Sequence, residues 1–117
     1  MITMPWPKPS AEKTTLLENV LTGKGERRFL FGAPTWFLGG NMFTGVFGND
    51  IFIRLTPTDQ TEMRRLGAKP FEPMKGRVMK EYLVLPHTVL SDYTLLAQWI
   101  DKSYSFVASL PAKDKKR

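Results

Sequence analysis

The segment from Phe29 to Leu55 constrains the fold of this chain more than any other. It reads FLFGAPTWFLGGNMFTGVFGNDIFIRL and is divided at Gly39-Gly40-Asn41 and at Gly48-Asn49-Asp50. Glycine lacks a Cβ and asparagine tolerates the left-handed region, so both breaks suit tight turns. Two such turns between three short apolar runs predict a β-meander with strands over 35–38, 41–47 and 51–55.

The alternation of side chains predicts how the last two of these strands are buried. In the final run, Ile51, Ile53 and Leu55 should share one face of the sheet, with Phe52 and Arg54 on the other. In the middle run, we expect one face to carry Met42, Thr44 and Val46 and the other to carry Phe43, Gly45 and Phe47. Both faces are apolar, which predicts an interior strand. Gly45 weakens a strand, so another side chain should pack closely over it.

A helix is expected before the meander. Ser10 is a good N-cap, and apolar residues recur on one face of a helix that runs to about Thr22. Gly23 and Gly25 should end this helix. A further strand is then expected over 29–31, ahead of the meander.

After the meander the sequence predicts a short helix, a loop and one more strand. Thr58 or Asp59 is expected to cap the helix, with Glu62 completing a capping box and Gly67 ending it. Met63 and Leu66 should form its buried side. We expect Phe71 and Met74 to anchor a loop over 68–76, and the strand to span 77–85.

The last predicted helix runs from Tyr93 to about Ser109, capped by Ser91 or Asp92. Its apolar stripe consists of Leu95, Leu96, Trp99, Ile100, Tyr104, Phe106 and Val107. The predicted fold is therefore α+β: a two-layer antiparallel sheet of about five strands covered by helices, in the order α-β4-α-β-α. The first and last helices should cover the meander.

Length and composition limit the kind of protein this is. A chain of 117 residues predicts a single domain. It has no cysteine, which excludes disulfides and thiolate metal sites, and no apolar run reaches the ~20 residues of a membrane helix. We therefore expect a cytoplasmic protein without membrane contact. The proline-rich arm over 1–9 and the tail over 112–117 are expected to be flexible, although Trp6 favours an arm that is anchored on the domain.

The net charge of +6 raises the alternative of nucleic-acid binding. Arg27, Arg28, Arg54 and the basic residues of the 113–117 tail would supply it. However, no helix has a long basic side and no aromatic RNA-binding pattern is present, so ordinary surface charge is the better explanation.

Candidate catalytic groups are few. His87 is the sole histidine, with Thr88, Ser91 and Asp92 nearby, but no nucleophile elbow surrounds them. One histidine and scattered carboxylates are a poor zinc site. The segment from Gly23 to Arg28 lacks the last glycine of a phosphate-binding loop and precedes a strand instead of a helix. The sequence thus predicts no enzyme and no cofactor; an enzyme built on His87 would need a ligand-sized pocket beside it.

Protein contact is the remaining possibility. Arg77, Lys80, Glu81 and Tyr82 lie on the last predicted strand, and arginine and tyrosine are enriched at interfaces. Together with Arg54 they are our candidate interaction surface. The alternative is a solvated strand face.

Several segments resemble the TfoX N-terminal domain family, in the same order along the chain. Leu30-Phe31-Gly32 stands where the family has Met-Phe-Gly, and Gly40-Asn41-Met42-Phe43 is similar to its Gly-x-Met-Phe hairpin. The most specific segment is 70–86, PFEPMKGRVMKEYLVLP, which resembles the P-F-E-P-M-x-G-R-x-M-x-E-Y segment of stand-alone members.

This resemblance implies a fold similar to that of secretion chaperones, no enzymatic activity, and a link to bacterial competence regulation through TfoX (Sxy). The resemblance assigns no catalytic residues to this chain. The leading hypothesis is therefore a non-enzymatic, regulatory module that binds an unknown protein partner, with a homodimer as a further expectation from the similarity of fold.

Overall fold

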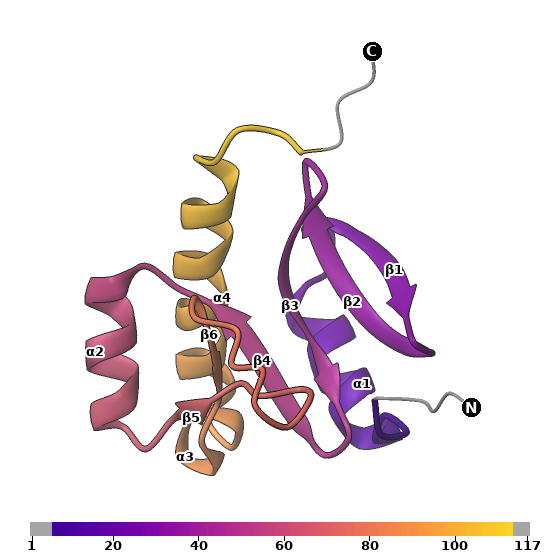
Figure 1. The fold of residues 1–117 in the computed structure, drawn as a ribbon, viewed down its shortest axis with the longest axis horizontal. Coiled ribbons are helices and arrows are strands. Elements are labelled where there is room, and N and C mark those ends of the chain that lie inside the picture. The colour runs from indigo at the N-terminus through magenta and orange to yellow at the C-terminus, as the bar shows by residue number, and fades with distance from the viewer. Residues whose placement is uncertain (1–5, 114–117) are drawn as a thin grey trace.

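The computed structural model describes residues 6–113; residues 1–5 and 114–117, which include most of the expected arm and tail, lie outside the described part. A six-stranded antiparallel sheet in the order β1-β2-β3-β4-β6-β5 carries four helices (Figure 1). The elements are α1 (Ala11–Val20), β1 (Glu26–Leu30), β2 (Ala33–Leu38), β3 (Asn41–Phe47), β4 (Asp50–Arg54), α2 (Pro57–Arg65), β5 (Lys69–Pro70), β6 (Tyr82–Val84), α3 (His87–Leu90) and α4 (Tyr93–Ala108). The predicted α+β class and element order are confirmed.

The glycine-punctuated meander is present as β2, β3 and β4. Gly39, Gly40 and Gly48 have φ values of 57°, 85° and 63°, so the turns use the left-handed conformation that glycine allows. Because both hairpins are tight, β3 lies between β2 and β4, inside the sheet as expected.

The faces of β3 differ from strict alternation. Trp36 pairs with Thr44 and Phe37 with Met42, so Phe43 is an extra residue on β3. This β-bulge turns Phe43 to the same cluster as Val46, while Met42 joins Phe47 on the other face. The expectation that grouped Met42 with Val46, and Phe43 with Phe47, was therefore wrong for Met42 and Phe43. For β4 it was right: Ile51 and Ile53 face one cluster and Phe52 the other.

Gly45 lies where the sheet is most crowded. A Cβ at this position would be 2.7 Å from both Phe52 Cζ and Thr35 Cγ2. The predicted close approach over Gly45 is confirmed, and the glycine is needed for space, since its backbone is not in the left-handed region.

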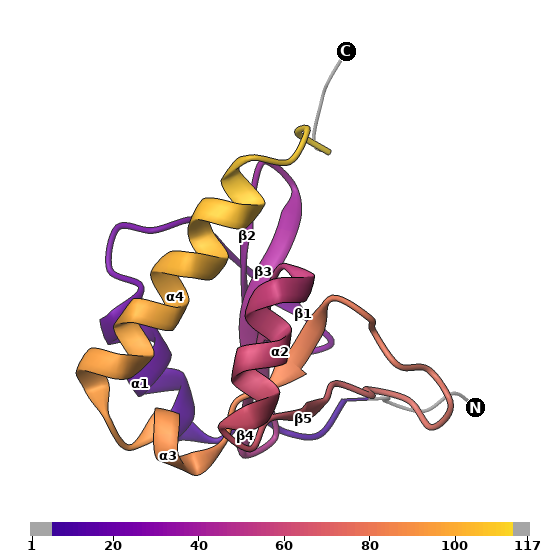
Figure 2. The same ribbon diagram turned by 90° about the vertical axis from the view of Figure 1, so that its left-hand side faces the viewer.

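The main core fills the space between the sheet and the helices. It joins Leu17 of α1 and Trp99 of α4 to Phe43, Val46 and Ile53 of the sheet, and all five side chains are buried. Figure 2 shows α1, α3 and α4 together on one side of the strands. Ser10 caps α1 and Asp92 caps α4 through side-chain bonds to Lys13 N and Leu95 N, as predicted.

A second, smaller core covers the opposite face of the sheet. It contains Trp6, Ala33, Phe52, Phe71 and Tyr82, all buried. Trp6 is thus anchored on the domain, and the segment between β5 and β6 crosses the same side of the strands (Figure 2). Both faces of the central strands are therefore buried from solvent.

Two expectations around α2 were wrong. Thr56, and not Thr58 or Asp59, is the N-cap: its side chain accepts from Asp59 N, and Pro57 is the first helical residue, where a missing N–H costs nothing. Leu66 is exposed, whereas Met63 is fully buried as predicted. Gly67 ends the helix with φ 110°.

The predicted strand over 77–85 was also wrong in extent. Only Tyr82–Val84 is a strand, because the preceding residues fold back: Met79 N donates to Phe71 O, and Tyr82 N donates to Met79 O. Phe71 anchors this loop as expected, but Met74 is 51% exposed. The short strand β5 and the single-turn helix α3 were not predicted.

Candidate interaction surface

An ion pair lies at the C-terminal end of β4, between Tyr82 of β6 and Phe106 of α4. Arg54 Nη2 and Nε are 2.6 Å and 2.7 Å from Glu81 Oε1. The register places Arg54 opposite Tyr82, and the guanidinium lies 5.6 Å from that ring and 5.8 Å from the Phe106 ring of α4. The guanidinium is thus held between two aromatic rings and a carboxylate.

Tyr82 is fixed beneath this ion pair. Its hydroxyl donates to Met42 O at 2.8 Å, which ties β6 to β3 across β4. Burial raises the pKa of Tyr82 above its usual value; the Arg54 charge opposes this effect and the Glu81 charge adds to it. Tyr82 is therefore a neutral hydrogen-bond donor at physiological pH.

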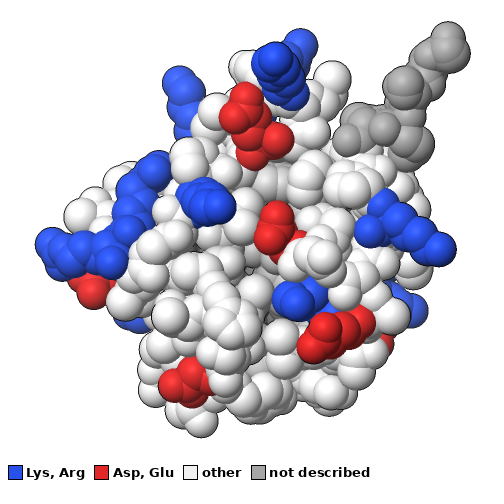
Figure 3. Space-filling view, turned by 90° about the horizontal axis from the view of Figure 1, so that it is seen from below, with Lys and Arg blue, Asp and Glu red and all other residues white. Residues whose placement is uncertain are grey.

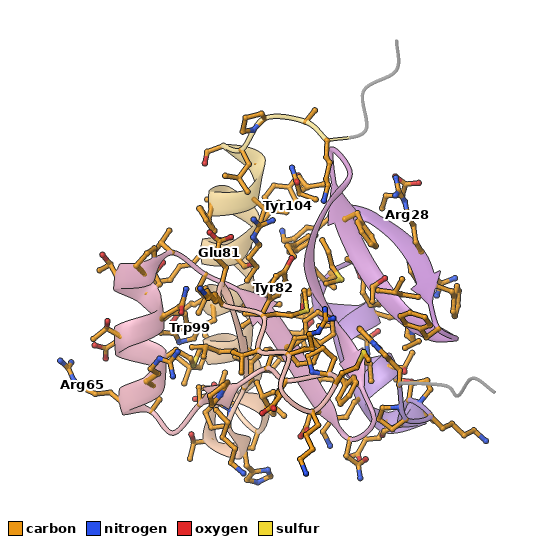
Figure 4. All side chains as sticks on the ribbon, in the orientation of Figure 1. Arg28, Arg65, Glu81, Tyr82, Trp99 and Tyr104 are labelled. Atoms are coloured by element: carbon orange, nitrogen blue, oxygen red, sulfur yellow. The ribbon has the colours of Figure 1, made fainter. Side chains whose placement is uncertain are left out.

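The five candidate interaction residues are not all brought together. Arg54, Glu81 and Tyr82 form one cluster, and Figure 4 shows Glu81 and Tyr82 side by side near the centre of the molecule. Arg77 and Lys80 are exposed on the loop between β5 and β6. They are separate because residues 77–81 form a loop instead of the alternating strand from which they were chosen.

The aromatic side chains below this cluster form a continuous series. Tyr82 contacts Phe52 and Phe71, with ring centroids 6.0 Å and 6.3 Å away, and Phe52 stacks on Phe71 at 4.2 Å. Trp6 lies at the far end, 5.8 Å from Phe52 and 5.9 Å from Phe71. One aromatic layer therefore runs from the Arg54–Glu81 pair to the N-terminal arm.

Sequence reasoning did not identify this layer as a site. Its signals were Trp6 in the arm, Phe52 on the second face of its strand and Phe71 in the loop, each of which was noted separately. They come together only because β6 inserts between β4 and β5, a pairing that no local pattern specifies.

A hollow of about 410 Å³ lies beside His87, so the pocket that the enzyme hypothesis requires is present. Its lining includes Asp50, Lys69 and Glu72, with Phe47 and Phe71 as apolar walls. Ser91 lines a second hollow, which His87 also borders, but within residues 6–113 no side-chain hydrogen bond joins His87 to Ser91 or Asp92. These groups do not form a nucleophile–base arrangement.

The remaining site hypotheses find little support in the geometry. Among residues 6–113, no group of three histidine or carboxylate side chains could hold a metal ion. The arginines named for nucleic-acid binding are ion-paired: Arg27 with Glu18 at 2.6 Å, Arg28 with Glu26 at 3.1 Å, and Arg54 with Glu81. Figure 3 shows basic side chains scattered among acidic ones on the face it displays.

Comparison with known proteins identifies the family of this chain. Residues 16–107 match the family model of the TfoX N-terminal domain. No curated protein and no solved structure matches the chain. None of the helices in the described residues is long and apolar enough to cross a membrane. The match spans most of the chain, from the middle of α1 to the end of α4, so the chain belongs to the TfoX N-terminal domain family, a regulatory rather than catalytic family that is linked to competence.

Proposed function

We propose that this protein is a regulatory module that binds another protein through the sheet face opposite the core helices. The main observation is that, among residues 6–113, the arm and the loop between β5 and β6 are the segments that cover this face. Large apolar side chains stay exposed on the covering loop and on the adjacent hairpin: Phe31 is 53% exposed, Met74 51% and Val78 50%. Exposed apolar side chains rimmed by charge are typical of protein contact sites.

The charged groups on this face support the same use. Arg77 and Lys80 extend from the loop, and the Arg54–Glu81 pair lies at its C-terminal end. Protein interfaces are enriched in arginine and in aromatic residues such as tyrosine. Met74, Arg77 and Val78 can be changed without disturbing the core, because their side chains are exposed.

A pull-down with matched variants tests this proposal. The full chain, immobilised through its C-terminal end, should capture a protein from a lysate of the cells that make it. The variant Met74→Ser/Arg77→Glu/Val78→Ser should lose this protein, whereas Arg64→Glu on the exposed side of α2 should keep it. Equal capture by all three chains would exclude this face as the contact surface.

Gel shifts at low and high salt address nucleic-acid binding. With the principal arginines ion-paired, we expect no shift at physiological salt, since each phosphate contact would have to replace an existing carboxylate contact. A shift that weakens steeply with rising salt would indicate that the partner is a nucleic acid and not a protein.

A further inference from the structure

We propose that the aromatic cleft around Trp6 is a peptide-binding site for an extended segment that carries an indole followed by proline. The cleft is formed by Phe31, Phe47, Phe52 and Phe71, and the arm of this chain occupies it in cis. This inference rests on the proposed function and specifies where the protein partner docks and which chemistry it presents.

The shape of the cleft fits an indole. Phe47, Phe52 and Phe71 meet the Trp6 ring edge to face, with centroids 5.0, 5.8 and 5.9 Å away and interplanar angles of 77°, 84° and 85°. Phe31 closes the rim at 5.7 Å with a tilt of 40°. Edge-to-face contacts at these distances are favourable, and together they leave Trp6 only 7% exposed.

Proline fits the position after the indole. Pro7 packs on the turn at Gly48, where an added Cβ would be only 3.0 Å from Pro7 Cγ. The absence of a side chain at Gly48 therefore makes room for the proline ring. Proline also keeps the segment extended and lowers the entropy lost when it docks.

The arm is attached by few contacts. Pro7 and Lys8 are exposed, and the first backbone hydrogen bond after Trp6 joins Ser10 N to Gly48 O at 2.9 Å. Within residues 6–10, Trp6 and Pro7 thus provide the side-chain contacts that hold the arm on the sheet. An element attached in this way can be exchanged for a similar segment without unfolding the domain.

Space for further residues adjoins the cleft. Phe47 and Phe71 are walls of both the cleft and the hollow of about 410 Å³. Asp50, Lys69 and Glu72 line this hollow and offer charges of both signs. A bound segment could extend from the indole position into it.

The test uses the full chain with Trp6→Ala, which empties the cleft, and a fluorescently labelled peptide of residues 1–10. Fluorescence anisotropy should show at least tenfold tighter binding to this variant than to the unaltered chain, where the tethered arm competes at an effective concentration on the order of millimolar. A peptide with alanine in place of tryptophan should bind neither chain.

Two exposed phenylalanines of the β1–β2 hairpin provide a matched control. Added to the Trp6→Ala chain, Phe31→Ala should weaken peptide binding severalfold, because Phe31 contacts the indole. Phe29→Ala should leave it unchanged, because Phe29 is 63% exposed and packs with Arg27 instead.

Three results would overturn the proposal. One is a folded Trp6→Ala chain that binds the tryptophan and alanine peptides alike. If that chain lacks a cooperative melting transition, millimolar tryptophan peptide should restore it, and failure to do so is the second. The third is a stable dimer of the unaltered chain with exchanged arms, which would make a second copy the occupant. None of these results alters the pull-down comparison of the loop variant with Arg64→Glu, so the cleft and the general contact face can fail separately.

Discussion

At two positions, Gly45 and Tyr82, a single substitution is expected to destabilise this domain. Gly45 has Phe52 and Thr35 against its backbone, and Tyr82 places a hydroxyl in a largely apolar layer. At Gly45 the constraint is the space for a side chain, whereas at Tyr82 it is the cost of ionising a buried hydroxyl. Different experiments therefore test the two positions.

Gly45→Ala should destabilise the protein by about 1–3 kcal/mol, because the new Cβ overlaps two side chains in a packed sheet. Urea unfolding monitored by circular dichroism measures this loss. Thr35→Ser removes the crowding Cγ2 but keeps the hydroxyl that donates to Arg28 O, so the double variant should lose less stability than the sum of the two changes. A Gly45→Ala cost below about 0.5 kcal/mol, the scale of a surface change, would contradict the crowding.

Tyr82 should make stability depend on alkaline pH. Its folded pKa is raised, so the stabilisation by the neutral phenol is complete below about pH 10 and is lost as the pH rises from there through the folded pKa. Tyr82→Phe should cost about 1 kcal/mol at neutral pH by removing the bond to Met42 O, and should flatten the alkaline decline. Urea titrations of both chains between pH 8 and 11 test this, and parallel pH profiles would show that Tyr82 does not contribute.

At the scale of elements, the sequence predicts the bounds of a helix or strand best where turn glycines or a capping residue mark its ends. The bounds of β3 were predicted correctly because glycine turns flank it on both sides, and α4 because its apolar period and Asp92 cap agree. Residues 77–81 were assigned to a strand because their composition suits one. Hydrogen bonds to distant residues instead fold them into a loop, and composition does not reveal those partners.

Which of the candidate interaction residues lie together could be predicted only in part, because their grouping depends on contacts between distant segments. Arg54 and Tyr82 meet because β4 and β6 pair, although 28 positions separate them in the chain numbering. The cleft around Trp6 needs the arm, the hairpin and the loop to meet, and only the tertiary structure brings them together. The bulge at Phe43 shows the same limit within one strand, since regular alternation gives no sign of it.

Trp99 is the main apolar anchor of α4. Trp99→Ala should cost about 3–5 kcal/mol, because the indole is buried between the helix layer and the sheet. Gln98→Ala, an exposed change one residue away, should stay within about 0.5 kcal/mol. Denaturant titration distinguishes them, and a Trp99→Ala loss below about 1 kcal/mol would argue against this packing.

The cap of α2 provides a second test at this scale. Thr56→Ala should cost about 0.5–2 kcal/mol, since its hydroxyl accepts from Asp59 N. Thr58→Ala, on the exposed first turn, should have little effect. Thermal melting of the two variants compares them directly, and the opposite ranking would restore Thr58 as the cap.

The whole molecule consists of a sheet with two unequal apolar layers. The layer under the helices contains Trp36 and Trp99, and the layer on the other face contains Trp6. The first is built from α1, α2, α3, α4 and four strands, whereas Trp6 joins the second through the arm alone. The two layers should therefore differ in how they respond to denaturant.

Labelling with 5-fluorotryptophan makes this difference measurable. In a urea series followed by ¹⁹F NMR, the native resonances of Trp36 and Trp99 should disappear at one common midpoint. The Trp6 resonance should move to its exposed position at lower urea, because the arm can detach while the main core persists. A common midpoint for all three would show that the arm belongs to the same cooperative unit.

Light scattering at micromolar concentration tests the expected homodimer. The sheet ends at β1, whose outer edge has no neighbouring strand among the described residues, and a second copy could pair there. A monomer mass at all concentrations would exclude the homodimer, but it would not bear on the proposal of a different protein partner.

The attachment of the C-terminal segment to the β2–β3 hairpin has a practical consequence. Lys113 N donates to Gly39 O, and Ala112 packs against Gly39, so the chain after α4 returns to the hairpin end that is opposite the Gly48 turn (Figure 1). A dye or affinity handle joined beyond residue 113 would start from that end of the molecule. Surface immobilisation by this route would leave the Gly48 end, where Pro7 and the indole dock, facing the solution.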